Sequence, residues 1–155
     1  MPIADSPQSQ PGSAYAASPD SIGSKYIKSL FKGYTDDTYT TLTEQPDWLG
    51  FQGPLIKAEV GDLIEVMVYN DLKAENHAIS MHSMGLHYSP ESEGSDYYRG
   101  SDENGTAVNY PGSAIAHHDC FVYKWLVTNQ SAPDPTLPSK LWSYHGDLNL
   151  DVSSD

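Results

Sequence analysis

The chain has 155 residues, a length that suits one domain with a single hydrophobic core rather than two domains. It carries 8 basic and 21 acidic residues, so its formal net charge is −13 at pH 7. A field of this sign repels nucleic acid and anionic membrane surfaces and attracts metal cations, which excludes nucleic-acid binding from the expected functions.

Residues 1–24 are predicted to form a disordered polar lead, and residues 25–155 the folded domain. The lead is dense in Ser, Pro and Ala and lacks aliphatic periodicity. It has no apolar segment typical of a signal peptide, and no apolar run in the chain approaches the roughly 18 residues that cross a bilayer. We therefore expect neither a classical signal peptide nor a membrane span. The single cysteine, Cys120, has no internal disulfide partner and does not identify the redox compartment.

The folded part is predicted to consist of short strands and frequent turns, because it is rich in Tyr, Gly and Pro. In chain order the expected strands are residues 26–32, 55–60, 63–70, 78–84, 120–127 and 141–145. The third of these has the strongest alternation of apolar residues. One of its faces is expected to be buried and the other partly covered. These faces are, in that order, Ile64, Val66 and Val68, then Leu63, Met67 and Tyr69.

Two connections between these strands are predicted to lack regular structure. Residues 90–106 are acidic and rich in Gly, without a core-like pattern, and are expected to form a long surface loop. Residues 131–138 contain three prolines and cannot be helical. Met67 and Met81 are both expected to lie in the core.

Three segments carry the most specific sequence pattern. They are D-W-L-G-F-Q-G-P-L-I-K-A-E-V-G-D at 47–62, S-M-H-S-M-G-L-H-Y-S-P-E-S-E-G at 80–94, and L-W-S-Y-H at 141–145. Together they resemble the first plastocyanin-like domain of multicopper oxidases of the ceruloplasmin and hephaestin type. The resemblance runs from about residue 25 to 147 and implies an all-β, cupredoxin-like Greek-key β-sandwich. The segments that would match its first and last strands are not found, so we expect a truncated domain with open sheet edges.

The resemblance also implies a set of copper ligands, of which this chain keeps only part. The family's domain supplies four histidines, in H-x-H-G and W-x-Y-H-S-H. His82 matches the first and His145 the third, whereas Met84 occupies the second position and Gly146 or Asp147 the fourth. Neutral imidazole suits copper in general, but a thioether suits Cu(I) and binds Cu(II) weakly. The metal candidates are therefore His82 and His145, with Met84, His87 and Asp147 as weaker ones.

Each candidate has a simpler interpretation. His82 and His145 either hold one metal ion together or are hydrogen-bonded polar residues at the end of a sandwich. His117, His118 and Asp119 precede Cys120, and a solvated loop is preferred there to an adventitious metal site. A solvated loop is also preferred for the acidic residues of the long loop, although the ferroxidases that this chain resembles use carboxylates to attract Fe(II). The acidic residues of this chain's loop are Glu91, Glu93, Asp96, Asp102 and Glu103.

By resemblance, the expected chemistry is copper-dependent oxidation of Fe(II) or phenolic substrates with reduction of oxygen to water. Because the ligand set is incomplete, the chain is not expected to be active alone. A second cupredoxin domain or chain would complete the copper cluster and the sheet edges, in part by strand addition. The alternative is a metal-free structural or interaction domain similar to those of blood-clotting cofactors. The resemblance favours an extracellular location, for which Asn104 and Asn129 are glycosylation candidates in N-x-S/T triplets.

Overall fold

The computed structural model describes residues 29–73, 77–95 and 98–146. Within this part of the chain there are short strands and 3-10 turns but no α-helix, so the all-β prediction is confirmed. The strands are β1 (Leu63–Tyr69), β2 (His82–Ser83), β3 (Tyr98–Ser101), β4 (Ala107–Asn109), β5 (Cys120–Leu126) and β6 (Tyr144–His145). The 3-10 turns are η2 (Asp47–Leu49), η3 (Pro90–Ser92) and η4 (Pro111–Ser113).

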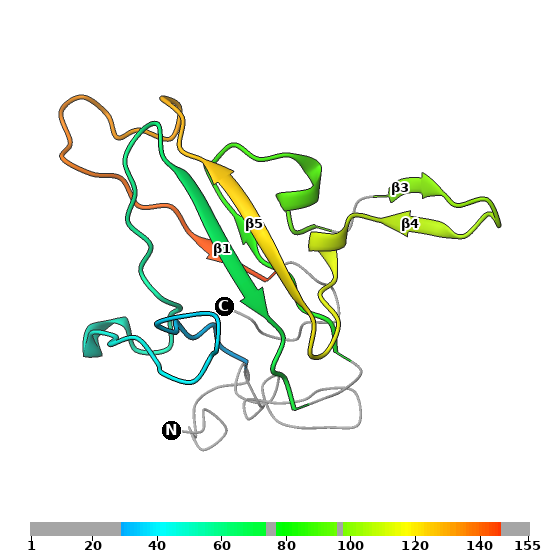
Figure 1. The fold of residues 1–155 in the computed structure, drawn as a ribbon. Helices are drawn as coiled ribbons and strands as arrows, with labels where there is room; N and C mark the ends of the chain where they lie inside the picture. Colours follow the sequence, from blue (N-terminus) through cyan, green and yellow to red (C-terminus); the bar gives the residue numbers. More distant parts are fainter. Residues whose placement is uncertain (1–28, 74–76, 96–97, 147–155) are drawn as a thin grey trace, which may run out of the picture.

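The longest element of the fold is the antiparallel pair of β1 and β5, which crosses the middle of the molecule in Figure 1. Its register places Leu63 opposite Leu126 and Tyr69 opposite Cys120. Both strands were predicted, because each alternates apolar residues with a period of two. Glu65 and Lys124 face each other on the outer side and form an exposed ion pair of 2.8 Å. Such a pair contributes little to stability.

The inner face of this pair builds the core. Tyr123 and Trp125 of β5 are 0% and 1% exposed, and they pack with Val68, Ile79, Met81 and Ile115. The prediction that Met81 lies in the core is confirmed. The same prediction is wrong for Met67, which is 45% exposed on the outer face of β1. Alternation assigns Met67 to one face of the strand but does not show whether another layer covers that face.

The second antiparallel pair is short and joins β2 to β6. His82 lies opposite His145, and Ser83 lies opposite Tyr144. Ser83 is buried and the Tyr144 hydroxyl donates to the carbonyl of Pro54 at 2.6 Å, so one side of this ladder faces the interior. Both strands are shorter than the sequence predicts. Of residues 78–84, only His82 and Ser83 form a strand, β2, and Ile79 forms an isolated bridge with Ile115.

Two predictions about the chain between the main strands are wrong. Residues 55–60 form no strand, and Leu55 and Val60 are about half exposed, because no described segment pairs with them. Residues 90–106 are not a plain loop. They contain η3 and most of a β3–β4 hairpin that projects away from the strand pair in Figure 1. The Asp102 carboxylate accepts from the amides of Asn104 and Thr106 and so closes its turn.

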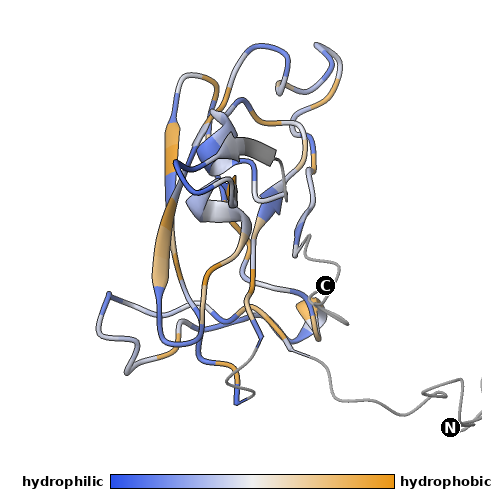
Figure 2. Ribbon diagram, turned by 90° about the vertical axis from the view of Figure 1, so that its right-hand side faces the viewer, coloured by the Kyte–Doolittle hydropathy of each residue, from blue (hydrophilic) through white to orange (hydrophobic). Residues whose placement is uncertain are grey.

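The strands form three separate two-stranded sheets in the described part of the chain, rather than two continuous sheets of a sandwich. Apolar residues, orange in Figure 2, occur in the connecting loops as well as on the strands. Exposed examples are Trp48, Phe51, Leu63, Leu137 and Leu141. Among the residues placed by the structure, no helix has the length and apolar character needed to cross a membrane. The predicted lead at 1–24, the first part of the predicted strand at 26–32, and Asp147 lie outside the described residues.

Candidate metal centre

His82 and His145 are direct neighbours across the β2–β6 ladder. Their ring centroids are 5.3 Å apart, and the ring planes are inclined by 54°. Directly opposite positions bring side chains on one face of an antiparallel pair into contact. The structure therefore brings together the two histidines that the sequence motifs single out, although they lie far apart along the chain.

Hydrogen bonds fix which nitrogen of each ring carries a proton. The Nδ1 atom of His82 lies 2.6 Å from the carbonyl oxygen of Glu93, and Nδ1 of His145 lies 2.8 Å from that of Gly146. A carbonyl oxygen only accepts, so each Nδ1 must donate. In a neutral imidazole the other nitrogen, Nε2, then keeps its lone pair. Both rings have the tautomer that a metal ion requires at Nε2.

Glu93 supplies a second contact to the same ring. Its carboxylate Oε1 lies 3.3 Å from Nδ1 of His82, and its Oε2 accepts from the amide of Ser95. The following residue, Gly94, has φ +88°, and a Cβ there would lie 2.3 Å from the carbonyl oxygen of Met81. Only glycine lets this turn approach β2 so closely. The turn thereby holds a carboxylate beside an imidazole, an arrangement typical of the groups that orient metal-binding histidines.

Met84 lies one step beyond β2 and faces Ser143. Its amide donates to the carbonyl of Ser143 at 3.0 Å, and the Ser143 hydroxyl donates to its sulfur at 3.2 Å. Because side chains alternate along an extended strand, Met84 lies on the same face of the ladder as His82. Its side chain is 46% exposed. The thioether is thus accessible to a solute on the side of the histidine pair.

Contacts of the Trp142 side chain stabilise the end of the β2–β6 ladder that lies next to Met84 and Ser143. The Trp142 indole Nε1 donates to the carbonyl of Ser131 at 2.9 Å, and the Ser131 hydroxyl donates to the carbonyl of Gly85 at 2.6 Å. The ammonium of Lys140 lies 4.0 Å from the centre of the Trp142 ring. These contacts fix the turn that follows Met84 against the segment that precedes β6.

The remaining candidates lie elsewhere. His87 is exposed, and its backbone forms a bridge with Leu126 of β5. His118 hydrogen-bonds through Nδ1 to the Tyr69 hydroxyl at 2.8 Å, and Cys120 is an exposed free thiol. Within the described residues no three His, Cys, Asp or Glu side chains converge on one point. Asn104 and Asn129 are exposed in turns, and Asp147 lies outside the described part.

The sequence analysis missed two residues that shape this site, Glu93 and Ser143. Glu93 is one of the acidic residues for which a solvated loop is expected, although it stands in the S-E-G part of the second motif, close to the turn at Gly94. Its neighbour Ser92 is buried and accepts from the indole of Trp125 through its carbonyl at 2.9 Å. The segment around Ser92 and Glu93 is therefore hydrogen-bonded to the core through Trp125.

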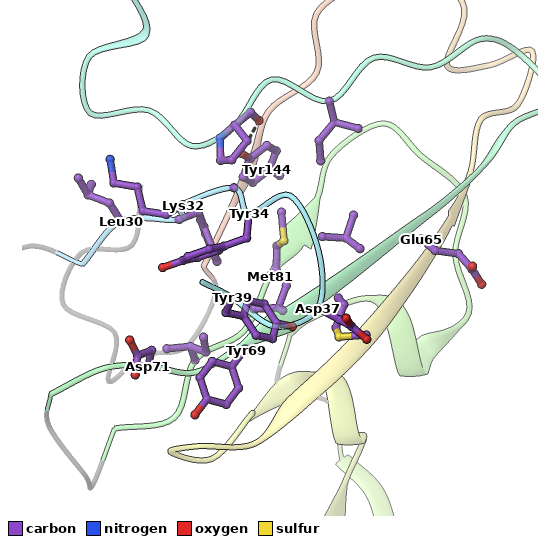
Figure 3. Close-up of a pocket in the computed structure, with 18 of the residues that line it drawn as sticks. Leu30, Lys32, Tyr34, Asp37, Tyr39, Glu65, Tyr69, Asp71, Met81 and Tyr144 are labelled. Carbon is purple, nitrogen blue, oxygen red and sulfur yellow. Dashed lines mark hydrogen bonds between the residues drawn. The ribbon is translucent and has the colours of Figure 1, made fainter. Parts of the chain in front are cut away.

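A cavity of about 1010 Å³ lies on the interior side of the fold, between the segment near residues 29–39 and β1 (Figure 3). Tyr34, Tyr39 and Tyr69 contribute rings to its wall, which Met81 and Tyr144 also line. Neither His82 nor His145 is among the described residues that line it. The cavity is therefore separate from the histidine pair, which lies on the opposite face of the β2–β6 ladder.

Comparisons with known proteins give related sequences for most of this chain. It is 37% identical to mouse hephaestin over 129 residues, which is 83% of this chain and 10% of hephaestin. It is 34% identical to human ceruloplasmin over 139 residues, 88% of this chain and 12% of ceruloplasmin. Human ferroxidase HEPHL1 is 33% identical over 132 residues, 84% of this chain and 11% of that protein. No family model matches the chain. The chain thus spans about a tenth of the length of these relatives.

Proposed function

Because this chain is homologous to one segment of the ferroxidases hephaestin, ceruloplasmin and HEPHL1, we propose that it is a copper-binding, plastocyanin-like domain of the multicopper ferroxidase type. Its architecture in this proposal is a cupredoxin-like Greek-key sandwich that is completed by a second cupredoxin domain or chain. The copper-dependent oxidation of Fe(II) or phenolic substrates belongs to such a completed assembly. The chain alone supplies His82 and His145, two of the four histidines that the resembling domain contributes to its copper cluster.

The observation that carries the proposal is the juxtaposition of His82 and His145. Their rings are neighbours, and each Nδ1 donates to a carbonyl, which leaves both Nε2 atoms available as donors. Imidazole nitrogen suits copper, and the net charge of −13 attracts cations to the protein. The donor set present therefore fits a copper ion, although not a complete trinuclear cluster.

Copper stoichiometry on the purified chain tests this proposal. Metal content is measured by elemental analysis after loading and dialysis for the wild type, His82→Ala and His145→Ala. His77→Ala is the matched control, because His77 is an exposed histidine outside the pair. We expect about one copper per chain in the wild type and control, and loss of copper in both site variants. Equal copper content in all four proteins would overturn the proposal.

A metal-free interaction domain is the second candidate function, and exposed apolar side chains favour it. Trp48, within η2, and Phe51, two residues after it, are 73% and 80% exposed, and Leu63 and Met67 are exposed on the outer face of β1. Large apolar side chains that a domain leaves exposed are groups that a protein partner can cover. The partner in this second proposal is a second cupredoxin-type domain.

Sedimentation velocity tests this second candidate with a second copy of the chain as the model partner. We expect concentration-dependent association of the wild type and a shift to monomer when Trp48 and Phe51 are both replaced by Ser. The double substitution Glu44→Gln and Glu103→Gln, at exposed polar positions, should leave association unchanged. A wild type that stays monomeric at high concentration would argue against a self-complementary surface.

A further inference from the structure

We propose that the β2–β6 ladder binds a cuprous ion, Cu(I), through two imidazoles and one thioether: His82, His145 and Met84. This inference rests on the copper binding proposed above. It adds the oxidation state of the bound ion and assigns the third ligand to Met84, which stands where the resembling family has its second histidine.

The register of the ladder places the three side chains on one face. His82 is opposite His145, and the hydrogen bond from the Met84 amide to the Ser143 carbonyl continues the antiparallel pairing by one more step. Met84 is therefore opposite Ser143 and diagonal to His145. Diagonal neighbours in an antiparallel pair are about 7–8 Å apart at the backbone and within reach of long side chains. The unbranched methionine side chain has the length to reach the imidazoles.

Ser143 holds the sulfur on this face. Its hydroxyl donates to the Met84 sulfur at 3.2 Å, and Ser143 shares its face with His145, two residues further along β6. One hydrogen bond uses one lone pair of the thioether and leaves the other for a metal ion. The 46% exposure of Met84 provides access from solvent, whereas His82 is enclosed by Glu93 and Tyr88. The Met84 sulfur is thus on the solvent-exposed side of the histidine pair.

The chemistry of this donor set selects the reduced ion. Neutral imidazole binds both oxidation states of copper, whereas a thioether is a soft, polarisable donor that favours Cu(I) and is a poor ligand for Cu(II). The Glu93 carboxylate, a hard donor, is turned toward Nδ1 of His82 and toward the Ser95 amide. The Glu93 carboxylate is therefore engaged at Nδ1 of His82 and not at Nε2, where the ion would bind. A set of two nitrogens and one sulfur remains for the ion.

Anaerobic competition against bicinchoninate, a chromogenic Cu(I) chelator, measures the affinity for Cu(I), and competition against a Cu(II) indicator measures the affinity for Cu(II). We expect Met84→Leu to lower the Cu(I) affinity at least tenfold, about the lower end of the loss caused by removing even an outer-shell partner. Its Cu(II) affinity should change less. Met67→Leu is the matched control, because Met67 is a methionine of nearly equal exposure on β1. Met84→His should reverse the preference toward Cu(II).

X-ray absorption at the copper edge supplies a readout that a structural role of Met84 would not move. We expect a sulfur neighbour in the Cu(I) spectrum of the wild type and Met67→Leu, and its absence in Met84→Leu. Copper that is lost in His82→Ala but binds Met84→Leu as tightly as the wild type, without a sulfur signal in either, would overturn this inference and leave the proposed function intact. A wild type that binds neither ion would overturn both.

Discussion

Gly85 lies directly against the indole of Trp142, so closely that a Cβ at residue 85 would lie 2.2 Å from the Cδ2 atom of the ring. The same glycine has φ +72°, a conformation that side chains with a Cβ disfavour. Gly85 follows Met84, and Trp142 lies two residues before β6, the strand of His145. The packing of these two residues therefore determines how the ends of the histidine ladder meet.

Replacing Gly85 with Ala is expected to destabilise the fold by more than its backbone conformation alone accounts for. The left-handed conformation costs roughly 1–2 kcal/mol, and overpacking against the indole adds about 1–3 kcal/mol. Urea unfolding followed by Trp fluorescence measures the total. Gly105→Ala is the control, because Gly105 has φ +79° and no atom within 4 Å of its added Cβ. Equal losses in the two variants would show that the indole moves aside without cost.

Glu93→Gln is expected to weaken copper binding about tenfold while the fold persists, because loss of a carboxylate beside a ligating histidine has that scale of effect. The variant removes the negative charge at Nδ1 of His82 but keeps the backbone carbonyl that accepts its proton. Chelator competition gives the affinity, and far-ultraviolet circular dichroism checks the fold. Glu103→Gln, in the exposed hairpin turn, controls for the change in net charge. Unchanged affinity would contradict an orienting role for the carboxylate.

Tyr123→Phe is expected to reduce the free energy of unfolding by about 1–3 kcal/mol, the cost of leaving buried polar groups unpaired. The Tyr123 hydroxyl donates to the carbonyl of Gly112 and accepts from the amide of Met81 at 3.0 Å. The Tyr123 residue is 0% exposed, so water cannot take the place of its hydroxyl as a hydrogen-bond partner. Tyr34→Phe is the control, since that ring is only partly buried and keeps its edge contact with Tyr39. Denaturant unfolding measures both, and equal stabilities would place the hydroxyl in contact with water.

Stability should fall at alkaline pH. Burial raises the pKa of Tyr123 to about 12 from 10.0, and burial also raises the pKa of Tyr144 to about 12. The folded protein keeps these protons where the unfolded chain has lost them. Their contribution is therefore complete below pH 10 and is lost as the pH rises from 10 toward 12. Unfolding in urea at a series of pH values measures the slope, which should be shallower in Tyr123→Phe. A slope that is unchanged in this variant would contradict the assignment.

The parts of the fold that the sequence predicts well are those with strong local periodicity. β1 and β5 alternate apolar residues over seven positions each. In the structure they pair side by side along their whole length. The segment at 55–60 has a similar composition, but a strand exists only where another segment supplies hydrogen bonds. Composition does not contain that information. Met67 illustrates the same gap, because the cover over a face comes from other parts of the chain.

The motif positions left the juxtaposition of His82 and His145 as one of two interpretations, because each motif places its histidine on a strand but does not give the register between the two strands. Glu93 and Ser143 could not be found in that way. Glu93 reaches His82 through a tight turn at Gly94, and Ser143 reaches Met84 through the register of two short strands. Both contacts depend on distances of a few ångströms between segments that are remote or separated by a turn. Periodicity and spacing along one strand do not determine such distances.

The two histidines are contributed by strands between which the chain makes its hairpin and the whole of β5 (Figure 1). An ion bound to both rings would act as a removable cross-link that closes this long loop. Because the two rings are neighbours only in the folded form, such an ion would stabilise that form by mass action, to an extent that rises with the concentration of free copper. The lifetime of the folded domain would then follow the supply of copper in its surroundings, and a chelator alone would shorten it.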